Sequence, residues 1–122
     1  DLATAYEAIR ISSGNSFVHE TEGQVILNGS RDINFTMDLV LKDISLFQEV
    51  ADRGRVPLEL SPLLINIFQD AQDRYGSREW SPNVIRRLED ATGLVIQAPG
   101  FPPEMLDGEP EVPGKEVVVI RN

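Results

Sequence analysis

The sequence predicts an all-α fold, a bundle of about five helices followed by a proline-rich C-terminal tail with one short strand. Three observations lead to this expectation. Apolar residues recur at helical spacing through most of the first 93 residues. Two Ser-Pro pairs are typical helix starts, because serine can cap free backbone N–H groups and proline fits the first turn. Three glycines follow the last apolar residue of a helical segment, as helix stops do.

Two helices are expected near the N-terminus. Residues 2–12 carry apolar side chains at helical spacing, and Asp1 stands where an N-cap would. A glycine-serine turn ends this helix, and Ser16 is positioned to cap a second one over residues 17–27. The sequence NGSRD, at 28–32, then stops the second helix.

The longest expected helix covers residues 35–54, with Gly54 as its stop. At 100° per residue its apolar side chains form one stripe, and Asp43 lies inside that stripe with Lys42 at its boundary. A carboxylate on a packed face is costly unless it is paired or hydrogen-bonded. Two explanations stay open. Asp43 is paired with an arginine or reaches solvent at a helix–helix gap, or the helix edge with Asp43 and Lys42 faces a ligand or another domain.

Two further helices are expected after the Ser-Pro pairs. The first has Ser61 as its N-cap and covers residues 63–75. The second has Ser81 as its N-cap and covers residues 83–92.

The sequence divides into a helical domain over residues 1–93 and an extended tail over residues 94–122. The tail is rich in proline and acidic residues, which do not favour a helix. EVVVI, at 116–120, is the strongest strand signal in the chain. An isolated strand is not stable, so it would need to pair with a partner chain or with another part of the protein.

Composition narrows the classes of function. The chain has 122 residues and a formal net charge of −9, so one domain and no nucleic-acid partner are expected. No apolar run reaches the roughly 18 residues that a membrane span needs. Without cysteine, and with His19 as the single histidine, thiolate and multi-histidine metal sites are excluded, and no metal is expected. The absence of cysteine fits a cytoplasmic protein.

No catalytic motif is present: the chain has no dinucleotide fingerprint, phosphate loop, nucleophile elbow or zinc-protease helix. It also begins without methionine, which favours a piece of a longer protein. We therefore expect the chain by itself to be inactive.

Several features together resemble the C-terminal domain of the β-hydroxyacid dehydrogenases, the family of 3-hydroxyisobutyrate dehydrogenase and a relative of 6-phosphogluconate dehydrogenase. A phenylalanine stands seven residues before a Lys-Asp pair, a long helix ends in Gly-x-Val-Pro-Leu, and a Ser-Pro helix start and a Tyr-Gly stop follow. The residues are Phe35, Lys42, Asp43, Gly54, Val56, Pro57, Leu58, Ser61, Tyr75 and Gly76. The turn SSGNSF, at 12–17, is also similar to a segment of the family.

The resemblance covers roughly residues 1–93 and implies a helical domain that completes an active-site cleft. It implies an N-terminal Rossmann domain that binds NAD or NADP, and an interdomain helix with the catalytic lysine, both outside this chain. No cofactor is therefore expected on this chain alone. The implied partners are that Rossmann domain, a short β-hydroxy acid or semialdehyde substrate, and further copies of the chain, since family members are usually dimers or tetramers.

Four site residues follow from the resemblance. Lys42 would approach the nicotinamide cofactor, and Asp43 would hold that lysine in place. Phe35 would form a wall of the substrate pocket, and Phe17 would be a second aromatic facing the substrate. Two alternatives remain: a non-catalytic helical module that binds another protein, and a relative such as an imine reductase that keeps the architecture without the catalytic lysine.

Overall fold

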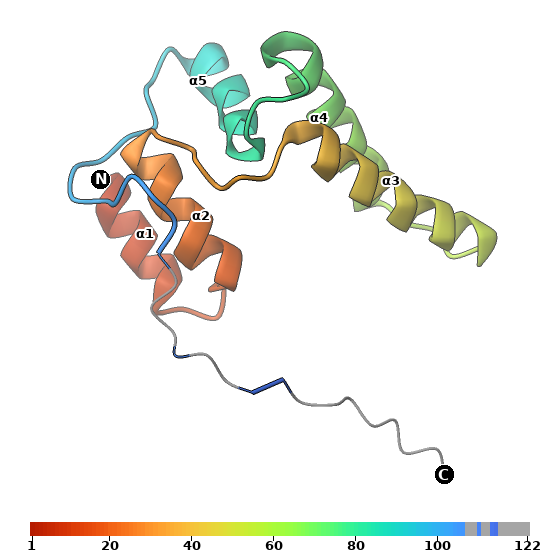
Figure 1. The fold of residues 1–122 in the computed structure, drawn as a ribbon, viewed down its shortest axis with the longest axis horizontal. Helices are drawn as coiled ribbons and strands as arrows, with labels where there is room; N and C mark the ends of the chain where they lie inside the picture. Colours follow the sequence, from red (N-terminus) through yellow and green to blue (C-terminus); the bar gives the residue numbers. More distant parts are fainter. Residues whose placement is uncertain (107–109, 111–112, 115–122) are drawn as a thin grey trace.

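The fold is all-α, as predicted (Figure 1). A computed structural model describes residues 1–106, 110 and 113–114, and the predicted strand at 116–120 lies outside these residues. The helices are α1 (Leu2–Arg10), α2 (Phe17–Asn28), α3 (Met37–Arg53), α4 (Leu60–Tyr75), the 3-10 helix η1 (Ser81–Ile85) and α5 (Arg86–Thr92). No helix in the described part of the chain is long and apolar enough to cross a membrane.

Helices α1 and α2 form an antiparallel pair whose ends are set by local capping (Figure 1). The Asp1 carboxylate accepts the N–H of Ala3 at 2.8 Å, and the Ser16 hydroxyl accepts the N–H of His19 at 3.0 Å. Both N-caps are as predicted. Gly29 ends α2 with a left-handed φ of 92°, a conformation that side chains with a Cβ rarely adopt.

Tyr6 is the centre of the interface between α1 and α2. Its ring is buried and stacks on the His19 ring with centroids 4.6 Å apart. Its hydroxyl donates to the carbonyl of Glu20 at 3.0 Å, so the polar end of the side chain is satisfied. A Cβ at Gly23 would lie 3.2 Å from the Tyr6 ring, so a glycine here lets α2 approach α1 closely.

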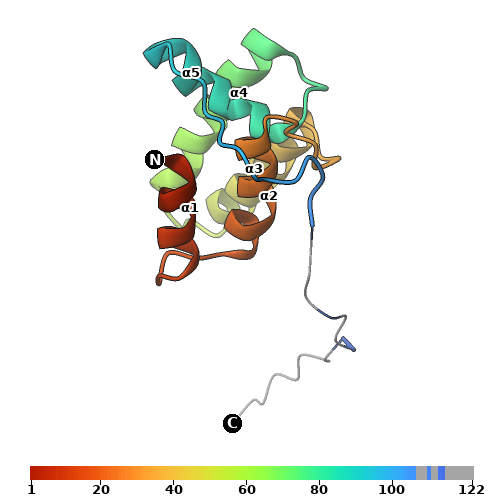
Figure 2. The same cartoon turned by 90° about the vertical axis from the view of Figure 1, so that its left-hand side faces the viewer.

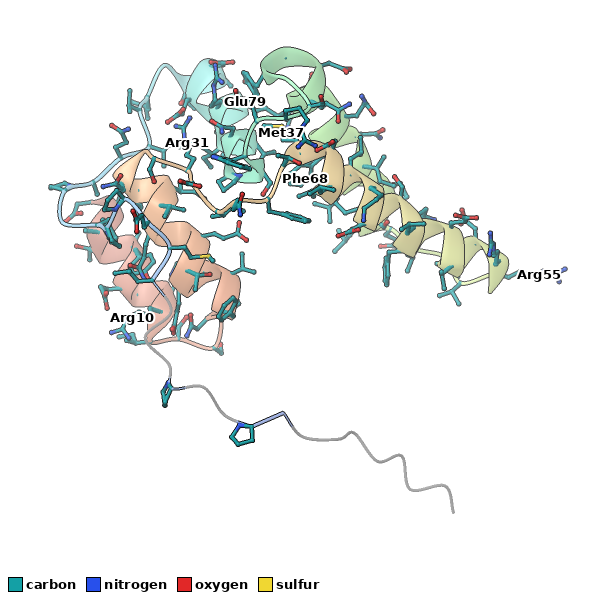
Figure 3. All side chains as sticks on the ribbon, viewed as in Figure 1. Arg10, Arg31, Met37, Arg55, Phe68 and Glu79 are labelled. Carbon is teal, nitrogen blue, oxygen red and sulfur yellow. The ribbon has the colours of Figure 1, made fainter. Side chains whose placement is uncertain are left out.

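Helices α3 and α4 form a second, longer pair that extends away from α1 and α2 (Figures 1 and 2). Met37, in the first turn of α3, is fully buried, and so is Ala71 of α4. The predicted stop at Gly54 is confirmed in position, but Gly54 keeps a φ of −77°. The left-handed residue is the next one, Arg55, at the far tip of the pair (Figure 3).

The predicted N-cap role of Ser61 is wrong. Helix α4 begins at Leu60, with Glu59 before it, so Ser61 lies within the first turn. Pro62 is compatible with this earlier start, because N–H groups of the first turn have no intrahelical acceptor.

At the second Ser-Pro pair the predicted helix over 83–92 is partly replaced by η1. The five residues from Ser81 form a 3-10 turn, and the α-helix begins only at Arg86. The Ser81 side chain makes no capping bond.

Candidate functional site

Lys42 and Asp43 lie on the second turn of α3 and pair with each other. The distance from Lys42 Nζ to Asp43 Oδ1 is 2.7 Å, and the two side chains are 57% and 54% exposed. Asp43 is therefore not buried and its ion-pair partner is Lys42 rather than an arginine, but it does reach solvent beside the gap between α3 and α4, as the first explanation also allowed. Exposed ion pairs contribute little to stability, so the pair has no evident structural role.

An apolar pocket of about 590 Å³ adjoins Asp43, between α3 and the start of α4. Asp43 and Glu59 contribute the two carboxylates of its lining, and Ser61 contributes a hydroxyl. Ser61 is only 6% exposed, and its Oγ has no hydrogen-bond partner among the described residues. The remaining lining residues are apolar: Ile44, Phe47, Pro57, Leu58, Leu60 and Leu64.

The two predicted substrate-facing aromatics lie on different parts of the fold, and neither lines this pocket. Phe35 is half-buried in the segment before α3, and its carbonyl accepts the N–H of Ser81 at 2.8 Å. Phe17 is the first residue of α2 and is 60% exposed. The structure thus brings Lys42 and Asp43 together on α3, while Phe17 belongs to the other helix pair.

The entrance of α3 is anchored to the turn between α4 and η1. The N–H of Met37 donates to the carbonyl of Glu79 at 3.0 Å, and Thr36 forms an isolated β-bridge with Trp80 (Figure 3). These bonds fix the N-terminal end of α3, the helix that carries Lys42. They depend on a contact between segments some 40 residues apart, which the sequence does not reveal.

Asp38 strengthens the same anchor and was not singled out from the sequence. Its carboxylate accepts the Thr36 hydroxyl, an N–H of Arg78 at 3.1 Å and the N–H of Leu39 at 3.0 Å. The hydrogen bond from Thr36, followed by those from Arg78 and Leu39, lowers the pKa of Asp38 although partial burial opposes this. A Thr-x-Asp sequence at a helix start was the available signal, because acidic residues favour the first turn.

Large apolar side chains are exposed along the outer part of the α3–α4 pair. They are Leu46, Phe47, Val50, Val56, Leu60, Leu63 and Leu64. Single exposed apolar residues are ordinary, but seven on one helix pair are more typical of a surface that another domain or chain covers.

No three potential metal ligands among histidine, aspartate and glutamate converge within the described residues. Lys42 places a cation beside Asp43 of the pocket lining, with Nζ 2.7 Å from Asp43 Oδ1. An ammonium carries three N–H donors, so it can bind an anionic or hydroxyl-bearing group as well as Asp43.

Comparisons with known proteins agree with the resemblance. Residues 1–88 match the family described as NAD-binding of NADP-dependent 3-hydroxyisobutyrate dehydrogenase. The 2-(hydroxymethyl)glutarate dehydrogenase of Eubacterium barkeri is 33% identical over 94 residues, which are 76% of this chain and 31% of that enzyme. The chain thus spans about a third of the length of this relative. With its all-α fold and the matched residues, the chain belongs to the β-hydroxyacid dehydrogenase family.

Proposed function

We propose that the chain is the C-terminal, substrate-side and oligomerisation domain of an NAD(P)-dependent oxidoreductase. The complete enzyme transfers hydride between the cofactor and a short β-hydroxy acid or its semialdehyde. The observation that carries the proposal is the exposed Lys42–Asp43 pair on α3, inside the segment that matches an NAD-binding family. The relative's name, a dehydrogenase of a hydroxy acid, supports the substrate class.

Lys42 is the residue that meets the cofactor, which a Rossmann domain holds. Its ammonium fits this role because it carries three N–H donors and the side chain is more than half exposed. Donation from an ammonium to phosphate or ribose oxygens forms charge-assisted hydrogen bonds, which are stronger than neutral ones. The bound nicotinamide supplies the hydride chemistry, while Lys42 and Asp43 bind and orient it.

Asp43 is a positioning residue in this arrangement. A lysine side chain has several rotatable bonds and loses rotamer entropy when it is fixed. The carboxylate 2.7 Å from Nζ restricts the ammonium to one side of α3 before the cofactor arrives. Binding of the cofactor then requires less additional ordering of the Lys42 side chain.

The exposed apolar residues of the α3–α4 pair support the oligomerisation role. A non-catalytic interaction module would expose a similar surface, but it would not require a match to a dehydrogenase family over residues 1–88. Phe35 and Phe17 are assigned to the substrate side, where their rings exclude water from an apolar part of the substrate.

The experiment is steady-state kinetics on the full-length protein with NAD and NADP, using 3-hydroxyisobutyrate and 2-(hydroxymethyl)glutarate as test substrates. Lys42→Ala is expected to raise the KM for the cofactor, or to lower kcat, by about tenfold or more, since tenfold corresponds to about 1.4 kcal/mol. Arg53→Ala is the matched control: it removes a cation from the same helix, where its side chain is 76% exposed. Unchanged kcat and KM for both cofactor and substrate in Lys42→Ala would contradict the proposal.

A further inference from the structure

The chain after α5 turns back and lies along the α1–α2 pair (Figures 1 and 2). The N–H of Ala98 donates to the carbonyl of Leu27 at 2.9 Å. The side-chain amide of Asn28 donates to the carbonyl of Phe101 at 2.8 Å. We call residues 96–103 the strap. The first bond occupies a backbone carbonyl at the C-terminal end of α2, where carbonyls lack intrahelical partners, and the second uses the Asn28 side chain.

Side chains hold the strap as well. The Ser30 hydroxyl donates to the carbonyl of Pro103 at 2.6 Å. The Phe101 ring meets the buried Tyr6 ring edge-to-face, with centroids 5.1 Å apart. Edge-to-face aromatic pairs contribute roughly 0.5–1.5 kcal/mol beyond the area that they bury. The strap is therefore bonded to both helices of the pair, and it extends the core around Tyr6.

The other end of the strap is attached to α5. The N–H of Ile96 donates to a carboxylate oxygen of Glu89 at 2.9 Å. The same carboxylate binds the guanidinium of Arg31, in the segment between α2 and α3. The strap thus connects α5, through Glu89, to the α1–α2 pair, through its contacts with the end of α2 and with Tyr6.

This connection matters because the two helix pairs share little direct packing. Helix α2 meets η1, whereas α3 packs chiefly on α4 (Figure 1). The orientation of the α1–α2 pair relative to α3 therefore depends on η1, which packs against both α2 and α3, on the segment at 29–36 and on the strap. Phe17 is on one side of this junction and Lys42 is on the other, while Phe35 lies in the segment that connects them.

We propose that the strap is a positioning element that sets the distance between Phe17 and the α3 residues Lys42 and Asp43. Phe101 acts through Tyr6, and Asn28 and Ser30 hold the strap backbone; none of these residues contacts the substrate. The inference rests on the proposed function, because it assigns Phe17 to the substrate side. The strap also lies beyond residues 1–88, which match the family, so it is a feature of this chain rather than of that match.

The test uses the full-length protein with Phe101→Ala. We expect the KM for the hydroxy-acid substrate to rise about tenfold, because displacing a substrate-facing group by about 1 Å can have effects of that size or larger. The KM for the cofactor is expected to stay within about twofold, because Lys42 remains on α3 and keeps its anchor. Phe101→Tyr, which keeps the ring, should restore the substrate KM, and Met105→Ala, just beyond the strap, should leave it unchanged.

Hydrogen exchange provides a readout that does not depend on activity. In Phe101→Ala, amides of the strap and of the C-terminal turn of α2 should exchange at least about tenfold faster, while those of α4 stay unchanged. If Phe101→Ala fails to fold, Ser30→Ala serves as the milder variant with the same expected pattern.

Unchanged exchange would overturn the docking of the strap. Faster exchange with an unchanged substrate KM would overturn its positioning role. Absence of dehydrogenase activity in the unmodified protein would overturn the proposed function and the positioning role with it, while exchange would still decide whether the strap is docked.

Discussion

Arg31 and Glu89 form a close ion pair that joins the segment before α3 to α5. Nη2 of Arg31 donates to both carboxylate oxygens of Glu89, at 2.8 and 2.7 Å. The side chains are only 13% and 16% exposed. Nη1 of Arg31 also donates to Asn83 of η1 at 3.2 Å, so one guanidinium binds two elements. Arg31 itself has a left-handed φ of 57°, a strained conformation for arginine that these bonds help to hold.

Arg31→Ala is expected to lower the free energy of unfolding by about 2–4 kcal/mol, because it leaves the Glu89 carboxylate mostly buried without its cation. Chemical denaturation with urea measures this change. Arg53→Ala, which removes an exposed cation, is the control and should change the free energy by about 0.5 kcal/mol or less. A loss no greater in Arg31→Ala than in Arg53→Ala would show that the pair does not hold the junction.

The same pair predicts how stability depends on pH. Burial alone would raise the pKa of Glu89, but the N–H of Ile96 and the guanidinium of Arg31 hold it below its ordinary value of 4.5. The folded state therefore prefers the charged carboxylate, and this contribution to stability is present above pH 4.5 and is lost as pH falls through the folded pKa.

Glu89→Gln removes this titration. Between pH 6 and pH 3, the urea midpoint of the wild type should fall more steeply than that of Glu89→Gln, so that the two curves converge at the acidic end. Parallel curves would contradict the assignment of the lowered pKa to Glu89.

Helix ends that depend on interactions between neighbouring residues are predicted well from the sequence. Ends that depend on long-range packing are predicted less well. Asp1 and Ser16 cap N–H groups two or three residues away, so a short stretch of sequence contains the whole interaction. Ser61 was misassigned because a first turn accepts proline at more than one position, and only packing selects the start. A helical projection places Asp43 among apolar neighbours correctly, but it does not say whether another element covers that face.

In the candidate site, too, the local features follow from the sequence and the long-range ones do not. The adjacency of Lys42 and Asp43 follows from the sequence, and so does their location on a helix. The relation of Phe17 to Phe35 depends on the segment between α2 and α3, where Arg31 and Asn34 both have positive φ values. Neither residue is glycine, so composition does not predict these turns.

Ser61 leads to a prediction about stability. Its buried Oγ has no hydrogen-bond partner in the described part of the chain, and burying such a hydroxyl costs roughly 1–3 kcal/mol. Ser61→Ala should therefore raise the free energy of unfolding, and urea denaturation measures the gain. Ser45→Ala, at an exposed position of α3, is the control, because it provides the same increase in helix propensity, about 0.5 kcal/mol, without removing a buried hydroxyl.

The difference in unfolding free energy between the two serine variants measures the cost of the buried hydroxyl. We expect Ser61→Ala to raise the free energy of unfolding by about 1 kcal/mol more than Ser45→Ala does. An equal or smaller gain at Ser61 would mean that its hydroxyl is satisfied in the folded protein, for example by water or by a covering domain in the pocket beside Asp43.

Gly29 is required for two separate reasons, which a double-mutant cycle can separate. Its φ of 92° is unfavourable for any residue with a Cβ, by roughly 1–2 kcal/mol, and a Cβ there would overlap the side-chain amide of Gln97 in the strap. Gly29→Ala should therefore destabilise the protein by about 2 kcal/mol in urea denaturation. Adding Gln97→Ala should recover only the part that is due to the clash, and faster hydrogen exchange in the strap should return toward the wild-type rate in the double variant. If Gln97→Ala recovers nothing and the strap amides exchange at the wild-type rate in Gly29→Ala, the strap does not contact the end of α2 as the structure has it.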